Sequence, residues 1–248
     1  MRSAPSTRRS NWRPPSRADE RVNRRGASTN RRGMRAPVAF AALTACAVAL
    51  SWLAHEWDRL PGDLWLARQI QDLPGTFEAS AELMRVATTT WVVVLVGTAM
   101  VTAFDFMGRR RAWLVFAIML LVLPPAQAAI KNLVDRPRPD PSLIERRATF
   151  TSESFPSGHV LGGTVVFLLA AWLVAGRLPA GWPRAAVWAI AVAACALGGI
   201  ANVYEGVHWP SDVLGGYLWA GVLLVGAWLA SLRWRSPPRP GVSARNGR

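Results

Sequence analysis

The sequence predicts an all-α membrane protein, built as a bundle of six transmembrane helices. Hydrophobic residues make up 51% of the 248 residues, and the mean hydropathy is +0.18. The apolar residues gather in six runs of 17 to 19 residues, close to the roughly 20 residues with which a helix crosses a hydrocarbon core about 30 Å thick. So many apolar runs leave too little polar sequence to cover the core of a soluble protein, which disfavours that alternative.

The six predicted helices contain no Asp, Glu, Lys or Arg. They cover residues 36–54, 86–104, 112–130, 160–176, 185–201 and 213–230. Because the charged residues all lie between or outside these runs, each run can be assigned to one crossing of the membrane.

The distribution of charge predicts the orientation of the bundle. Basic residues in short flanking segments stay on the cytoplasmic side. With both termini in the cytoplasm, the inner segments hold 21 of the 29 basic residues but only three of the 15 acidic ones. We therefore expect a multi-pass protein of the cell (inner) membrane with cytoplasmic N- and C-termini.

The ends of the chain are predicted to lie outside the membrane domain, which covers residues 36–232. Residues 1–35 are rich in Arg, Ser and Pro and lack apolar periodicity, as is typical of a disordered cytoplasmic arm. Their charge would suit nucleic acid, anionic lipid or a transit signal, but a solvated arm that sets topology is the simplest interpretation, and no nucleic-acid partner is expected. Residues 233–248 form a basic cytoplasmic tail.

Polar clusters occur at three helix ends that this topology places together on the outer face. They are Lys131 and Arg138 after the third run, Ser157, Gly158 and His159 before the fourth, and His208 and Asp212 between the fifth and sixth. The topology follows from hydropathy and charge alone, so the coincidence of all three clusters on one face favours a shared site.

The first two clusters favour binding of a phosphate group. Lys131 is the only lysine in the chain, and a compact ammonium suits a small tetrahedral anion better than a wide guanidinium. Arg138 follows it by seven residues. Ser157 and Gly158 precede a helix, whose free N–H groups and positive dipole end attract anions.

The third cluster supplies a reactive group. Pro210 suits an early helical position, which places Asp212 in the first turn, where it can orient the His208 imidazole. An oriented neutral imidazole is a competent nucleophile, and His159 is the candidate proton donor for the leaving oxygen. His55, at the outer end of the first run, is interpreted as an interfacial residue.

These motifs resemble those of the type-2 phosphatidic acid phosphatase superfamily. The matching stretches are "KNLVDRPRP", "PSGH" and "HWPSD", which span 82 residues from Lys131 to Asp212. The resemblance implies that His208 forms a phosphohistidine while Asp212 orients it and His159 protonates the leaving group. It also implies that the phosphoryl oxygens are bound by Lys131, Arg138 and the Ser157–Gly158 segment, with no metal and no cofactor.

One position departs from the family pattern. The third signature of the family begins Ser-Arg, whereas this chain has Ala201 and Asn202 there. Asn202, which we place among the phosphate-binding residues, carries no charge, and loss of one transition-state donor costs on the order of 3 kcal/mol. Three arginines could compensate: Arg136, Arg146 and Arg147.

The sequence therefore predicts a metal-independent lipid phosphate phosphatase that hydrolyses a phosphomonoester or diphosphate headgroup at the outer face. Two alternatives are a lipid phosphotransferase with the same intermediate, and a catalytically impaired phospholipid-binding protein. The expected partners are a lipid phosphate substrate and membrane lipids. Phosphatidate, phosphatidylglycerophosphate and polyprenyl diphosphate stay open as substrates, and so does the oligomeric state.

Overall fold

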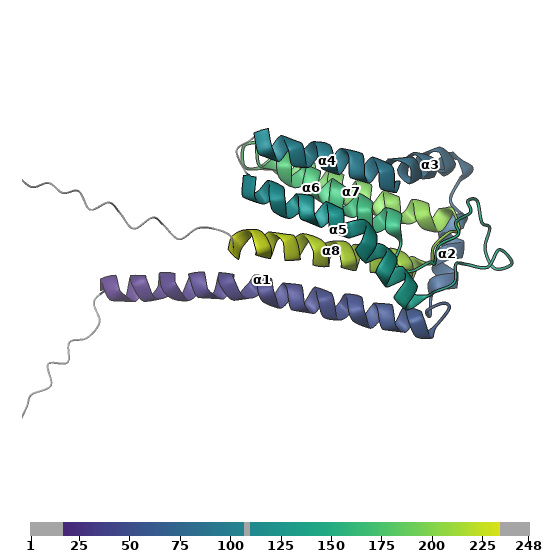
Figure 1. Cartoon of the computed structure of the whole chain (residues 1–248), viewed down its shortest axis with the longest axis horizontal. Coiled ribbons are helices and arrows are strands. Elements are labelled where there is room, and N and C mark those ends of the chain that lie inside the picture. The colour runs from purple at the N-terminus through teal and green to yellow at the C-terminus, as the bar shows by residue number, and fades with distance from the viewer. Residues whose placement is uncertain (1–16, 107–109, 234–248) are drawn as a thin grey trace, which may run out of the picture. The chain divides into compact units, whose positions relative to one another are not determined.

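Eight α-helices and one short 3-10 helix make up the part of the chain that the computed structural model describes, residues 17–106 and 110–233, and this part contains no strand (Figure 1). The elements in chain order are α1 (Arg17–Glu56), α2 (Asp63–Gln71), η1 (Gly75–Phe77), α3 (Glu78–Ala87), α4 (Thr90–Phe106), α5 (Arg110–Val134), α6 (Gly158–Ala175), α7 (Trp182–Tyr204) and α8 (Pro210–Arg233). The all-α prediction is thereby confirmed.

Five helices are long and apolar enough to cross a membrane, and a bent pair supplies a sixth candidate span. The five spans are Pro37–Glu56, Phe116–Val134, Gly158–Ala175, Trp182–Tyr204 and Pro210–Ser231. The bent pair consists of Gly75–Ala87 and Thr90–Ala103, which meet at 59°. Each span overlaps one of the six predicted runs.

The second predicted helix is broken where the sequence suggested one continuous run. Residues 86–104 begin inside α3 and cross a break at Thr88 and Thr89. The Thr88 hydroxyl donates to the Met84 carbonyl at 2.6 Å, and the Thr89 hydroxyl donates to the Val86 carbonyl at 3.0 Å. Such bonds from threonine to the preceding turn compete with the helix and bend it.

The chain divides into two units, residues 1–39 and 40–248, and α1 runs through both. Within the first unit, residues 17–35 are helical, which differs from the predicted disordered arm. This stretch contains no proline and several Arg and Ala residues, which are good helix formers. Residues 1–16 of the predicted arm and residues 234–248 of the tail lie outside the described residues.

Within the second unit, α6 is the most buried of the five long spans, with 56% of its 18 residues buried inside the protein. It packs against α4, α7 and α8. Leu161, Val165 and Leu169 of α6 form a core cluster with residues of α5 and α8. Gly162 lies so close to Val93 of α4 that an added Cβ would be 3.3 Å from its methyl groups. Small residues of this kind allow helices to approach closely in a membrane.

Three chain segments that carry the predicted polar clusters meet at one end of this packed unit. The end of α5, the start of α6 and the start of α8 lie there together with α2 and the long 135–157 connection (Figure 1). α5 extends to Val134, beyond its predicted end at residue 130, and stops where Asp135 adopts a positive φ of 48°. Lys131 therefore lies in the last turn of α5, and Arg138 follows on the connection.

Candidate active site

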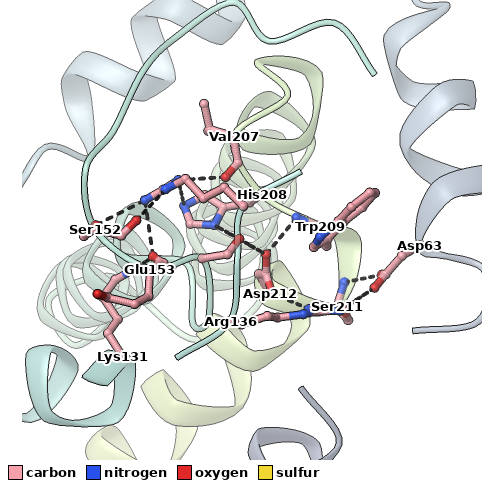
Figure 2. Close-up of polar contacts among 12 residues, drawn as sticks. Asp63, Lys131, Arg136, Ser152, Glu153, Val207, His208, Trp209, Ser211 and Asp212 are labelled. Carbon is pink, nitrogen blue, oxygen red and sulfur yellow. Dashed lines mark hydrogen bonds and ion pairs between the residues drawn. The ribbon is translucent and has the colours of Figure 1, made fainter. Parts of the chain in front are cut away.

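The His208 imidazole lies between the carboxylate of Asp212 and the guanidinium of Arg138. Figure 2 shows His208 beside Asp212 and near the Val207 carbonyl. The His208 side chain is only 2% exposed. Its Nδ1 lies 3.6 Å from Oδ2 of Asp212 and 3.5 Å from the Ser154 hydroxyl, while its Nε2 lies 3.4 Å from Nη1 of Arg138. A guanidinium can only donate, so the lone pair belongs on Nε2 and the proton on Nδ1. This tautomer leaves Nε2 as the nucleophilic atom.

Burial lowers the pKa of His208 to about 3, and the positive charges of Arg138 and Lys131 act in the same direction against the opposing influence of Asp212. Burial likewise lowers the pKa of Arg138 to about 10, with a further contribution from the charge of Arg146. At neutral pH the site therefore holds a neutral imidazole beside a charged guanidinium.

This pKa predicts the titration of His208 in the folded protein. The imidazole of the unfolded chain titrates near pH 6.5. Between about pH 6.5 and about pH 3, the unfolded state therefore binds a proton at His208 that the folded state does not bind. The free energy of unfolding consequently decreases as the pH falls through this range. The chain has three histidines, so a His55→Gln, His159→Gln protein labelled with nitrogen-15 reports on His208 alone. We expect a neutral imidazole spectrum from about pH 8 to about pH 5. A titration midpoint near pH 6.5 would contradict this geometry.

Asp212 is held on both of its oxygens. Oδ1 accepts from Nη1 of Arg136 at 2.5 Å. Oδ2 accepts from the Ser154 hydroxyl at 2.5 Å and from the Trp209 backbone N–H at 2.8 Å. α8 begins at Pro210, which places Asp212 in its first turn as predicted. Because the carboxylate is fully buried and cannot rotate without breaking these bonds, it presents a fixed acceptor beside His208.

The guanidinium of Arg136 is not available to replace the arginine that the family pattern places at residue 202. Its side chain is completely buried, and it donates to Asp212, to the Ser211 hydroxyl at 2.8 Å, to Asp63 at 2.9 Å and to the Asp58 carbonyl at 3.1 Å. Its donors are therefore committed to protein acceptors behind the His208–Asp212 pair.

Lys131 and Arg138 converge on the backbone of the 135–157 connection. The Lys131 ammonium, which is 6% exposed, donates to the Glu153 carbonyl. Arg138 donates from Nε to the Ser152 carbonyl at 2.7 Å and from Nη1 to the Val207 carbonyl at 2.7 Å. The two predicted cations thus share one turn of backbone beside His208, although Arg138 lies beyond the end of the helix.

The start of α6 presents a hydroxyl without a protein partner. Ser157 occupies the N-cap position, but its side chain forms no capping bond, and its buried Oγ has no hydrogen-bond partner among the described residues. The Ser157 N–H donates to the Asp212 carbonyl at 3.1 Å, which fixes this turn to α8. Gly158 is the first residue of α6, where helical N–H groups lack intrahelical acceptors.

His159 lies in the first turn of α6 and is half-buried. Its ring meets the Phe150 ring edge to face at 5.5 Å, and the Arg138 guanidinium lies over the same Phe150 ring at 4.8 Å. Phe150 thus connects the predicted proton donor to the cations. Phe150 could not be predicted from the sequence, because an isolated aromatic residue on a connection carries no positional signal.

Asn202 directs its amide into its own helix. It is 3% exposed, and Nδ2 donates to the Gly198 carbonyl at 2.8 Å. One amide hydrogen is thereby used four residues earlier in α7. Asn202 therefore does not reproduce the long, charged side chain that the family pattern places at this position.

Two arginines of the 135–157 connection lie near the turn before His208. Arg147 donates to the Tyr204 carbonyl at 2.7 Å, and its guanidinium lies 4.0 Å above the Tyr204 ring. Arg146 donates from Nη2 to the Pro139 carbonyl, whereas its buried Nε has no partner in the described part of the chain. The Arg146 backbone packs against Gly206, whose φ of 69° is accessible to glycine at little cost.

No group of three or more His, Cys, Asp or Glu side chains that could hold a metal ion occurs in residues 17–106 and 110–233, the part that the structure describes. The charges that act on the pKa of His208 are those of Arg138 and Lys131, which lower it, and that of Asp212, which raises it.

The model of the PAP2 superfamily matches residues 111–236, which is half of the chain and contains all three clusters. The chain belongs to the PAP2 superfamily. This confirms the resemblance that the motifs indicated. Together with its apolar helices, membership of the PAP2 superfamily makes the chain a multi-pass membrane protein.

Several relatives of the chain are phosphatases whose names specify a phosphorylated lipid. The chain is 36% identical over 89 residues to phosphatidylglycerophosphatase B of Bacillus subtilis, which covers 36% of this chain and 42% of that protein. It is 34% identical over 124 residues to decaprenylphosphoryl-5-phosphoribose phosphatase of Mycobacterium tuberculosis, covering 50% and 61%. It is 40% identical over 85 residues to the putative undecaprenyl-diphosphatase YbjG of Escherichia coli, covering 34% and 36%.

The matches thus span less than two thirds of each of these relatives. Among solved structures, a transmembrane PAP2-type phosphatidylglycerolphosphate phosphatase from Bacillus subtilis matches with 27% identity and a TM-score of 0.44. That match covers 82% of this chain and 96% of that one.

The PAP2 match contains most of the site residues that sequence reasoning missed, but not all of them. Arg136, Phe150 and Ser154 lie inside residues 111–236, whereas Asp63 lies on α2, well before the match begins. Arg136 was noted only as a possible phosphate ligand, and its position beside Arg138 in "DRPRP" was the available signal. Asp63 had no signal in the sequence.

Proposed function

We propose that this PAP2 protein is a metal-independent lipid phosphate phosphatase that hydrolyses a phosphomonoester or diphosphate headgroup through a phosphohistidine on His208. The observation that carries the proposal is the placement of the imidazole, with Nδ1 beside Asp212 and Nε2 beside Arg138. An imidazole held in this way has its lone pair directed to the place where a guanidinium attracts a phosphoryl group. The names of the relatives agree with this substrate class.

In the first half of the reaction, the phosphoryl oxygens accept hydrogen bonds from Lys131, Arg138, the free Ser157 hydroxyl and the first N–H groups of α6, beginning at Gly158. Nε2 of His208 attacks phosphorus, an N–P bond forms, and the bond from phosphorus to the lipid oxygen breaks. His159 gives a proton to that leaving oxygen. The Nδ1 proton stays on the ring, where the Asp212 carboxylate stabilises the positive charge that develops.

In the second half, His159 is neutral and accepts a proton from a water molecule that attacks phosphorus. The N–P bond breaks, inorganic phosphate leaves, and the electron pair returns to Nε2 of His208. Transfer to a lipid or other hydroxyl in place of water would turn the same intermediate into a phosphotransferase reaction.

Arg146 is our candidate for the cation that the family pattern places at Asn202. Its Nε is buried without a partner in the described residues, and its charge lies close enough to Arg138 to lower the pKa of that residue. The Asn202 amide, in contrast, is directed to Gly198 of its own helix. We therefore assign Asn202 at most a hydrogen-bonding role toward phosphate, and Arg146 the charge.

A phosphate-release assay with purified protein tests the proposed function. The panel contains phosphatidate, phosphatidylglycerophosphate and a polyprenyl diphosphate, each with and without a chelator. We expect release of inorganic phosphate from at least one lipid, unchanged by the chelator and inhibited by orthovanadate, which adopts the trigonal-bipyramidal shape of the transition state. A phosphorylated acceptor without free phosphate would favour the phosphotransferase. Binding without turnover would favour the impaired lipid-binding protein, and loss of activity to the chelator would contradict metal independence.

The site is proposed to face the outside of the cell, with the membrane domain at residues 36–232 and both termini in the cytoplasm. The support is the segregation of basic residues, of which 21 in 29 lie in the proposed inner segments. In a chain in which Cys46 and Cys195 are replaced by alanine, a single cysteine at exposed Ser142 should react with an impermeant thiol reagent in intact cells. A single cysteine at Ser6 should react only after lysis. Labelling in the reverse pattern would contradict the topology.

A further inference from the structure

We propose that Asp63 and Arg136 are positioning residues that set the charge of Asp212, so that helix α2 takes part in activating His208. The inference rests on the proposed role of His208 as the nucleophile. Asp63 is 73 residues from Arg136 and 148 residues from Ser211 in the sequence, yet all three side chains meet behind Asp212 (Figure 2).

Arg136 connects the two carboxylates. Nη1 lies 2.5 Å from Oδ1 of Asp212, and Nη2 lies 2.9 Å from Oδ2 of Asp63. The side chain of Arg136 is 0% exposed, and those of Asp212 and Asp63 are 0% and 4% exposed. Buried ion pairs of this kind are screened little by solvent, so each partner strongly affects the other.

Asp63 also holds the start of the helix that carries Asp212. Oδ1 accepts from the Ser211 backbone N–H at 2.9 Å, and Oδ2 accepts from the Ser211 hydroxyl at 2.6 Å. Ser211 lies in the first turn of α8, so Asp63 supplies the first turn of that helix with an acceptor from a different helix. The Leu60 N–H, which donates to Oδ2 at 2.8 Å, fixes Asp63 in turn.

The cluster contains two carboxylates and one guanidinium. If Arg136 paired with Asp212 alone, its positive charge would weaken the stabilisation that Asp212 gives to the positive ring of phosphorylated His208. Because Asp63 also pairs with Arg136 and partly neutralises it, Asp212 interacts more strongly with the Nδ1–H of His208. Removing the charge of Asp63 should therefore weaken the interaction between Asp212 and His208 without removing either residue.

Phosphate binding should change much less than the chemical step. The hydrogen bonds of Asp63 in the described residues go to Leu60, Arg136 and Ser211, and none goes to Lys131 or Arg138. An effect through Asp212 therefore predicts a lower kcat with a nearly unchanged KM, whereas disorder of the whole site would change both.

The test compares Asp63→Asn with wild type and with Asp72→Asn, a matched control at the exposed end of the same helix. The first readout is the Nδ1–H proton resonance of His208 in the substrate-free protein, which needs no activity. We expect Asp63→Asn to move this resonance upfield, because the electrostatic interaction of the Nδ1–H with the Asp212 carboxylate, 3.6 Å away, weakens. Asp72→Asn should leave it unchanged.

The second readout is single-turnover phosphorylation with an aryl phosphate. Asp63→Asn should slow phosphoenzyme formation by about tenfold or more, with KM changed by less than about twofold, because buried groups that share one hydrogen-bonded network are strongly coupled. Arg136→Lys keeps the positive charge but loses the planar guanidinium that bonds both carboxylates. Phosphoenzyme formation by this variant should therefore also be slower than in wild type. If Asp63→Asn does not fold, Ser211→Ala removes one link of the same cluster and should cause a smaller change in the same direction.

An unchanged His208 resonance and a wild-type phosphorylation rate in Asp63→Asn would overturn the proposal, even if its Tm fell. Failure of the proposed function is a separate outcome, because wild type would then turn over substrate without any phosphoenzyme. In that case the resonance alone decides: an upfield shift supports the role of Asp63, and an unchanged resonance overturns it.

Discussion

Replacing His208 with alanine should lower the turnover of lipid phosphate by at least about 10⁴-fold, because the variant has no atom in place of Nε2 to attack phosphorus. The loss should be equally severe for an aryl phosphate, since an easier leaving group does not replace a missing nucleophile. Steady-state phosphate release from equal amounts of folded protein measures this effect.

The matched control is His55→Ala. His55 is exposed at the end of α1, and its Nδ1 lies 3.0 Å from the Val134 carbonyl, so the variant loses one contact to the end of α5 but no site residue. It should keep most of its activity. Substantial turnover by His208→Ala would mean that water or another residue attacks phosphorus directly.

Replacing His159 with alanine should have an effect that depends on the leaving group. A lipid alkoxide needs a proton to depart, so turnover of a lipid phosphate should fall by about 10²–10⁴-fold. An activated aryl oxide needs almost no proton, so aryl phosphate should be hydrolysed only a few-fold more slowly if the second half-reaction is not limiting. The measurement is kcat/KM for both substrates, which reports the first half-reaction.

Phe150 provides a control for this assignment. Its ring contacts both His159 and the Arg138 guanidinium, so Phe150→Leu keeps an apolar side chain while it removes the aromatic contacts. It should affect lipid and aryl phosphates equally, because it changes the placement of groups and not the proton supply. An equal loss on both substrates for His159→Ala would contradict its role as the proton donor.

Hydropathy, charge and motif spacing predicted the spans and the composition of the three clusters. The uncharged runs indicate where helices cross the membrane. Pro210 indicates the start of α8, so that Asp212 lies in the first turn of that helix. These features are local, and local patterns can be recognised in one sequence. The break at Thr88 and Thr89 was missed because threonine occurs both within and at the ends of helices.

The support behind the nucleophile could not be predicted, because it depends on contacts between distant segments. Ser154 bonds to Asp212 from the 135–157 connection, and Asp63 bonds to Arg136 from the start of α2. A single sequence does not show which of these distant residues meet in space. The direction of the Asn202 amide was likewise unpredictable. The family pattern identified the position, but the bond to Gly198 depends on the conformation of the side chain.

The most direct test of the account is to identify the phosphorylated residue. The purified protein is mixed with an aryl phosphate, quenched in alkali to preserve phosphohistidine, digested and mapped by mass spectrometry. A second sample is quenched in acid, where the modification should be lost. The account predicts phosphate on His208 alone, formed at a rate at least equal to kcat and absent from His208→Ala. Phosphate on another residue, or turnover with no labelled residue at any time, would contradict the central claim that His208 is the nucleophile.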